Sequence, residues 1–115
     1  MAFYLVRSLN NVSCYGRVPD PFSGPEGAFQ EFSISSSDSL LLDGDFCDPI
    51  NELCGTLLDY GDIDYFDAEQ CKMLVSWINQ RLRWECERPL LRLYAVLLEY
   101  AEQAIALGTG VVVEL

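Results

Sequence analysis

A long stretch of this chain contains no basic side chain. There is no lysine, arginine or histidine between Arg17 and Lys72, and residues 18–71 hold thirteen of the eighteen carboxylates. This acid-only stretch carries a formal charge of −13 and the rest of the chain +2, which together give the net charge of −11. Uncompensated charge repels itself and disfavours a compact state. A fold that keeps so much uncompensated charge is therefore expected to use its electric field to attract a strongly basic partner or cations.

The acidity does not come from a disordered tail. Half of the residues are hydrophobic and 12% are aromatic, whereas disorder combines high charge with low hydrophobicity. A chain of 115 residues is expected to form one domain, covering 1–115. It can bury roughly two thirds of the surface that its unfolded form exposes. We therefore expect it to fold without metal or disulfide bonds.

The five cysteines predict reduced thiols. Their number is odd, they form no CxxC pair, and no secretory signal is recognised ahead of them, which favours a cytoplasmic protein with mostly buried cysteines. No apolar run approaches the roughly 18 residues of a membrane span. The negative net charge also argues against binding to nucleic acid or to an anionic membrane, since both are anionic themselves.

The first 40 residues are predicted to be β-rich. Residues 2–9 are rich in aromatic and β-branched side chains, which favour a strand. Three prolines and two glycines crowd into 19–27, which predicts a loop, and the serine-rich segment 33–39 predicts another. Further short strands are expected at 12–18 and 28–34.

The segment that follows Asp48 is predicted to be the first of three helices within residues 48–107. Asp48 is a suitable N-cap, and Pro49 suits the first helical position because its missing N–H is not needed there. Gly61 is expected to end this helix. Its apolar stripe consists of Ile50, Leu53, Cys54, Leu57 and Leu58.

Two longer helices and a strand are predicted after it. Residues 67–70 resemble a capping box, with aspartate as the cap, and an apolar stripe follows over 71–82. Pro89 and Gly108 suit the start and the end of the third helix. The valine run predicts a terminal strand at 110–115.

This order of elements indicates a single α+β domain. Its sheet would be small, antiparallel or mixed, and built from the N-terminal half plus the C-terminal strand. About three α-helices would pack against that sheet.

The residues present exclude several kinds of site. Without histidine there is no Ser-His-Asp or Cys-His site and no histidine metal ligand. The acidic runs 43–48 and 59–67 fail the EF-hand pattern, since its fifth position is Cys47 in one and Phe66 in the other. An irregular calcium site stays open as an alternative. No nucleotide or metal motif is present, so we expect no cofactor and no enzymatic activity.

The run from 59 to 67 interleaves aromatic residues with acids. Three aromatics lie among its carboxylates, and protein interfaces favour aromatic anchors together with charge complementarity. The alternative is that Ile63 and Phe66 pack beneath a loop and only the acids are exposed. Either arrangement predicts an acidic patch.

Four arginines cluster near the end of the second predicted helix and the start of the third. Arg81, Arg83, Arg88 and Arg92 either bind an acidic ligand or form surface pairs with Glu85, Glu87 and Glu99. Trp77 and Trp84 are one heptad apart and so would share a helical face. Neither lies squarely on the apolar stripe of Leu74 and Ile78, so an exposed or dimer-forming face stays open as an alternative.

The layout of residues 59–115 is similar to that of a known protein family. It consists of the acidic entry from Asp62 to Glu69, a helix with Cys71, Leu74 and Trp77, a helix with Leu93, Tyr94, Ala104 and Ile105, and the closing segment from Gly108 to Leu115. In this layout the chain resembles the small immunity proteins of bacterial polymorphic-toxin and contact-dependent growth-inhibition systems.

The resemblance implies a non-catalytic bacterial protein that binds and neutralises a cognate toxin domain. A basic nuclease is the expected kind of toxin, because an acidic surface would compete with the phosphate backbone. An acidic secretion chaperone or adaptor is the main alternative, and a DNA-mimic inhibitor is another. The residues expected to contact the partner are Asp43, Asp45, Asp59, Tyr60, Asp62, Asp64, Tyr65 and Asp67.

Overall fold

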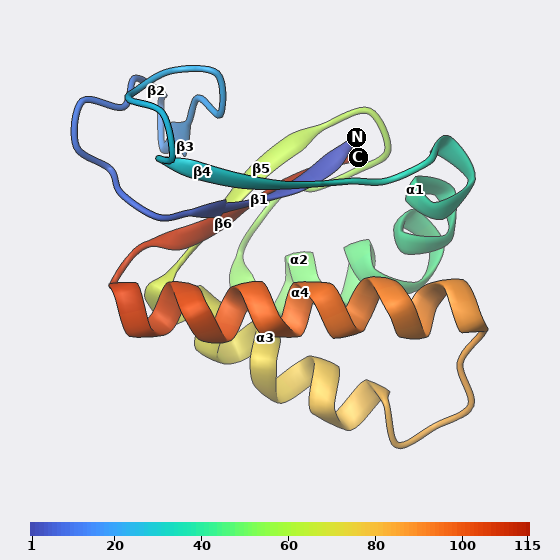
Figure 1. The fold of residues 1–115 in the computed structure, drawn as a ribbon. Helices are drawn as coiled ribbons and strands as arrows, with labels where there is room; N and C mark the ends of the chain where they lie inside the picture. The colour runs from blue at the N-terminus through green and yellow to red at the C-terminus, as the bar shows by residue number, and fades with distance from the viewer.

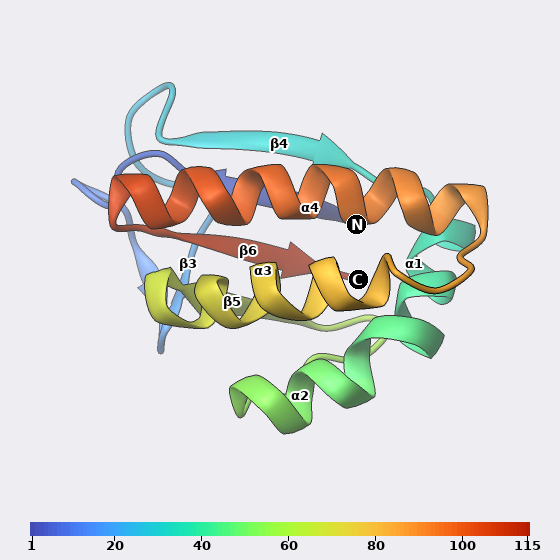
Figure 2. The same ribbon diagram turned by 90° about the horizontal axis from the view of Figure 1, so that it is seen from below.

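A four-stranded antiparallel sheet with helices on one face forms the centre of the molecule (Figures 1 and 2). The computed structural model describes all residues from 1 to 115 and confirms the predicted α+β class. The strand order is β4-β1-β6-β5. The central strands are β1 (Ala2–Val6) and β6 (Gly110–Glu114), and the edge strands are β4 (Phe29–Ser33) and β5 (Ile63–Asp67). The predicted strands at 28–34 and 110–115 are therefore present.

The central strands are buried on both faces of the sheet. Phe3 and Leu5 face the helices, whereas Tyr4 and Val6 face the opposite side, as the alternation along a strand requires. Such a strand reads as a continuous apolar run. Gly110 starts β6 where it crosses β5 closely: a Cβ there would lie 2.3 Å from the carbonyl oxygen of Phe66.

Two of the helices agree with the prediction. The capping box of Asp67 starts α3 (Ala68–Arg81), and Gly108, with a φ of 69°, ends α4 (Arg88–Leu107). They pack on each other and on the sheet, with a core of 22 buried residues between the layers. None of the helices is long and apolar enough to cross a membrane.

The first helical segment of the chain begins earlier than predicted. It runs without a break through α1 (Ser36–Leu42), the π-helical turn η1 (Asp43–Cys47) and α2 (Asp48–Cys54). The predicted serine-rich loop at 33–39 is therefore wrong. The hydroxyl of Ser35 accepts a hydrogen bond from the Asp38 N–H at 3.1 Å and caps the helix.

Asp48 is not a helix start but an interior residue of this segment. Pro49 cannot donate a hydrogen bond to a preceding carbonyl, and the wider π turn directly before it accommodates that gap. The helix ends at Gly55, which has a φ of 70°. Leu57 and Leu58 therefore lie beyond the helix, and the predicted end at Gly61 is wrong.

The region predicted as helical, 48–107, also contains the edge strand β5. Tyr65 pairs with Val112, and Phe66 with Val111. Aspartate is depleted in strands, so the acids of this run favoured a loop in the sequence. Their alternation with Ile63 and Tyr65 has the period of a strand instead.

A separate hairpin covers the outer face of the sheet. The expected strand at 12–18 is a tight turn between β2 (Cys14–Tyr15) and β3 (Val18–Pro19). Figure 1 shows this hairpin on the side of the sheet away from the helices. A small second core lies there, made of Ala2, Tyr4, Val6, Tyr65 and Val112.

All five cysteines are free thiols. Cys47 and Cys71 are buried, Cys54 and Cys86 are half-buried, and Cys14 is exposed. Burial raises the pKa of Cys71 to about 12, so its thiol stays protonated at neutral pH.

Candidate functional site

Cations from outside the acid-only stretch neutralise four of its carboxylates. Arg17 binds Asp64 at 2.9 Å, Arg81 binds Asp45 at 3.0 Å and Arg92 binds Asp38 at 2.9 Å. The fourth pair, Lys72 with Glu69, spans three residues at the start of α3. The expected arginine pairs with Glu85, Glu87 and Glu99 are wrong, because Arg81 and Arg92 reach across to the helical segment 36–54. Nine carboxylates of the stretch have no ion pair: Asp20, Glu26, Glu31, Asp43, Asp48, Glu52, Asp59, Asp62 and Asp67.

Asp45 lies at the centre of a three-residue network. The Nε and Nη2 groups of Arg81 donate to its two carboxylate oxygens, each at 3.0 Å, and the Tyr94 hydroxyl donates to one of them. Burial alone would raise the pKa of Asp45, but the hydrogen bonds from Arg81 and Tyr94 outweigh it and lower that pKa. Burial and the same contact raise the pKa of Tyr94 well above its usual value. Asp45 thus connects η1 to α3 and α4.

Asp64 fastens the hairpin to the edge of the sheet. Arg17, in the hairpin turn, donates to Asp64 at 2.9 Å and to Gln70 at 2.7 Å, and its guanidinium lies 5.9 Å from the ring centre of Tyr65. The second oxygen of Asp64 accepts the Leu57 N–H at 3.0 Å. Tyr65, an expected anchor for a partner, is buried at 8% exposure beneath this contact.

The unpaired acids gather around the π turn and the following loop. The Tyr60 N–H donates to Asp43 at 3.1 Å and to Asp59 at 2.8 Å, which holds these two carboxylates side by side. Burial first, and then the charges of Asp43, Asp59 and Asp48, raise the pKa of Cys47 beneath them to about 12. The Tyr60 side chain is 44% exposed.

We call this region the free-acid surface. Glu52 follows Asp48 by one helical turn, so the two lie on the same side of α2. Asp62 is exposed and joined to the loop by a 2.9 Å bond from its N–H to the Asp59 carbonyl. The free-acid surface thus consists of Asp43, Asp48, Glu52, Asp59 and Asp62, with Tyr60 among them.

The remaining predicted residue, Asp67, has a structural task. Its carboxylate accepts the Gln70 N–H at 2.9 Å and caps α3, although it stays exposed and without an ion pair. Of the eight expected contact residues, Asp43, Asp59, Tyr60 and Asp62 come together on the free-acid surface. Asp45, Asp64 and Tyr65 are engaged inside the fold.

The hairpin adds an exposed apolar hollow that sequence reasoning missed. It measures about 480 Å³ and lies between Tyr15, Phe22 and Ile63. Tyr15 and Phe22 are 76% and 82% exposed. The dense proline and glycine content of the segment predicted a loop and nothing about its surface. The available signal was the presence of aromatic residues in and beside that loop, Tyr15 and Phe22.

The chemistry open to these residues is that of a charged binding surface. No three cysteine, aspartate or glutamate side chains converge to form a group that could hold a metal ion. Four carboxylates of the free-acid surface are exposed and that of Asp43 is half-buried, so they keep contact with water until a partner displaces it. Comparisons of the chain with protein-family models, with curated proteins and with solved structures found no match.

Proposed function

We propose that this chain is a non-catalytic immunity protein that binds and neutralises a basic toxin domain, such as a nuclease. The observation that supports the proposal is the division of its acids. The fold engages Asp38, Asp45 and Asp64 with arginines, while the free-acid surface keeps five carboxylates without a cation. A solvated surface of one sign suits an oppositely charged partner.

Electrostatic complementarity of this kind acts mainly on the rate and the specificity of association. Steering by charge can raise an association rate by roughly ten- to a thousandfold, and salt suppresses it. Tyr60 supplies an exposed aromatic side chain among the acids, and such residues anchor interfaces. The surface therefore combines a steering field with one candidate anchor.

Growth rescue tests the proposal. The C-terminal domain encoded by the reading frame immediately upstream is expressed with and without this chain. We expect that domain alone to stop growth and the wild-type chain to restore it. No rescue, with both proteins shown to be present in soluble form, would overturn the immunity role.

Neutralising variants then test the surface. D43N/D59N/D62N removes three charges from the free-acid surface, and E26Q/E99Q/E102Q removes three exposed charges elsewhere. At low salt we expect the first variant to lower the association rate with the toxin domain by about tenfold or more, and the control to lower it much less. Equal effects of the two variants in stopped-flow measurements would mean that only net charge matters and would remove this surface from the proposal.

A further inference from the structure

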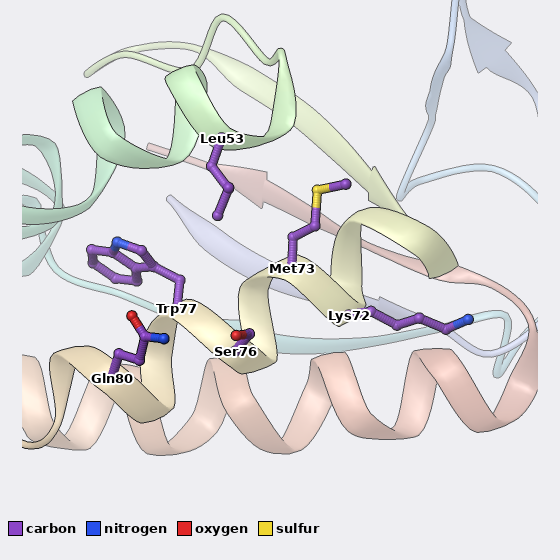
Figure 3. A pocket seen from close by; sticks show the side chains of 6 residues that line it. All are labelled: Leu53, Lys72, Met73, Ser76, Trp77 and Gln80. Carbon is purple, nitrogen blue, oxygen red and sulfur yellow. The ribbon is translucent and has the colours of Figure 1, made fainter.

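An apolar groove lies between α2 and α3. It measures about 430 Å³ and is lined by Leu53, Lys72, Met73, Ser76, Trp77 and Gln80. Figure 3 shows Leu53 of α2 and Met73 and Trp77 of α3 projecting into the space between the two helices. Leu53 is 48% exposed and Met73 41%, so water covers side chains that would be stabilised by apolar contact.

The groove continues along α3. A second hollow of about 220 Å³ shares Trp77 and Gln80 with the first and extends to Arg81 and Trp84. Trp84 is 75% exposed. Met73, Trp77 and Trp84 thus supply the apolar side chains along the two hollows, with the polar Gln80 and Arg81 between the tryptophans. The Trp77 ring borders the core on its other side, where it packs edge-on against Tyr94 of α4 with the ring centres 5.6 Å apart.

The exposed side of α2, beside the groove, is acidic. Ile50 points into the core, and Leu53 lies to one side of it, facing the groove. Asn51 lies to the other side and binds the backbone of Leu58. The helical period places Asp48 and Glu52 between these two sides, on the solvent-facing side of α2, with Glu52 directly before Leu53 in the chain. On the opposite bank the only cation at the first hollow is Lys72, and Glu69 already pairs with it at 2.9 Å.

We infer that this groove binds an amphipathic basic α-helix of the partner. The apolar side chains of the bound helix contact Leu53, Met73 and Trp77, and its lysines or arginines face Asp48 and Glu52. An amphipathic helix lying in an apolar groove is a common recognition mode. The inference rests on the proposed function for the identity of the partner as a toxin domain, while the chemistry of the occupant follows from the groove itself.

A second copy of this chain fits the groove poorly. Each copy carries a net charge of −11, so two copies repel each other over the distances at which they would meet. The length of the groove also suits a helix. The part of α3 that lines the two hollows runs from Lys72 to Arg81 and spans about 15 Å, which matches about three turns of a bound helix.

A synthetic peptide tests the inference on the purified protein. The probe has about 14 residues, with leucines at helical spacing on one face and lysines elsewhere. The variant W84F leaves Trp77 as the single tryptophan. Because Trp77 lines the groove, we expect its emission to shift to the blue in a saturable titration. A peptide of the same composition with scrambled order is expected to bind at least about tenfold more weakly.

Matched variants locate the bound peptide. L53S/M73S removes two apolar groups from the groove, and L107S removes an equally exposed leucine at the end of α4 (48% for both leucines). We expect the first to weaken peptide binding by about tenfold or more and the second to leave it unchanged. No saturable shift, equal binding of the scrambled peptide, or unchanged binding by L53S/M73S would each overturn the inference. So would a wild-type dimer in sedimentation that L53S/M73S dissociates, because a second copy would then occupy the groove.

The toxin experiment separates this inference from the proposed function. Growth rescue that L53S/M73S retains in full, with unchanged toxin affinity, would overturn the groove as the docking site and leave the immunity role standing. Peptide binding in the groove by a chain that gives no rescue would overturn the immunity role and support the groove as a site for basic helices.

Discussion

The engaged acids and the free acids of this molecule have different surroundings. The side chains of Asp38, Asp45 and Asp64 are 12%, 24% and 13% exposed, and each contacts an arginine. The acids Asp48, Asp59 and Asp62 are exposed and have no cation nearby. A carboxylate that leaves water needs a partner, whereas one that stays in water does not.

The comparison shows that the charge of the acid-only stretch serves two purposes. Arginines from β2–β3, α3 and α4 hold three distant parts of the stretch in place, so these acids contribute to the fold. The free-acid surface has no ion pair of this kind. Apart from the Tyr60 N–H that Asp43 and Asp59 accept, its carboxylates mainly add repulsion. If this division holds, substitutions that break the contacts of the engaged acids should lower the stability of the protein, and substitutions of the free acids should not.

The largest effect is expected from Arg81. R81M removes both hydrogen bonds to Asp45 and leaves a partly buried carboxylate with Tyr94 alone, so we expect a loss of about 2–3 kcal/mol of unfolding free energy. Arg83 is exposed and has no ion pair, so R83M should change stability by less than about 0.5 kcal/mol. Urea unfolding measures both. Equal effects of the two variants would mean that the Asp45 network is not structural.

A smaller effect is expected at Asp64. D64N loses the charge that binds Arg17 and weakens the acceptor of the Leu57 N–H, which should cost about 1–2 kcal/mol. The nearby D62N removes a free acid and should be neutral or slightly stabilising. If D62N destabilised the protein as much as D64N, the distinction between engaged and free acids would fail at this edge of the sheet.

The pH dependence of the R81M effect gives a finer test. The pKa of Asp45 is lower in the folded chain than in the unfolded chain. The stability that the charged form of Asp45 contributes is therefore complete above the unfolded pKa of about 4, and it is lost as the pH falls through the folded pKa. The difference in unfolding free energy between wild type and R81M should shrink as the pH is lowered from 5 to below 3. The other acids are common to both proteins and largely cancel. A difference that stays constant with pH would contradict the assignment.

Much of the fold could be predicted from the sequence because its signals are local. The capping box at Asp67, the glycine after Leu107 and the valine run of β6 each specify structure within a few residues. The start of the first helical segment was missed because five serines favour a loop by composition. What decides that segment is tertiary packing of Leu42 and Phe46 into the core.

The candidate site was less predictable, because pairing depends on contacts between distant residues. Nothing local indicates that Arg17 would meet Asp64 or that Arg81 would meet Asp45, which are 47 and 36 residues apart. The sequence also offered no reason to place α2 beside α3. The groove between them and the burial of Tyr65 follow only from the packed structure.

The smallest effect is expected from screening. Raising the salt from 0.01 to 0.15 M shortens the Debye length from about 30 to about 8 Å, which weakens repulsion within the free-acid surface. We expect the wild type to gain about 0.5–1 kcal/mol in urea unfolding, and D43N/D59N/D62N to gain less than the control E26Q/E99Q/E102Q. An equal gain in both variants would show that the repulsion is spread over the whole molecule. If the first variant is more stable at low salt and also binds the toxin domain more slowly, the free acids reduce stability in favour of association, as a binding surface would.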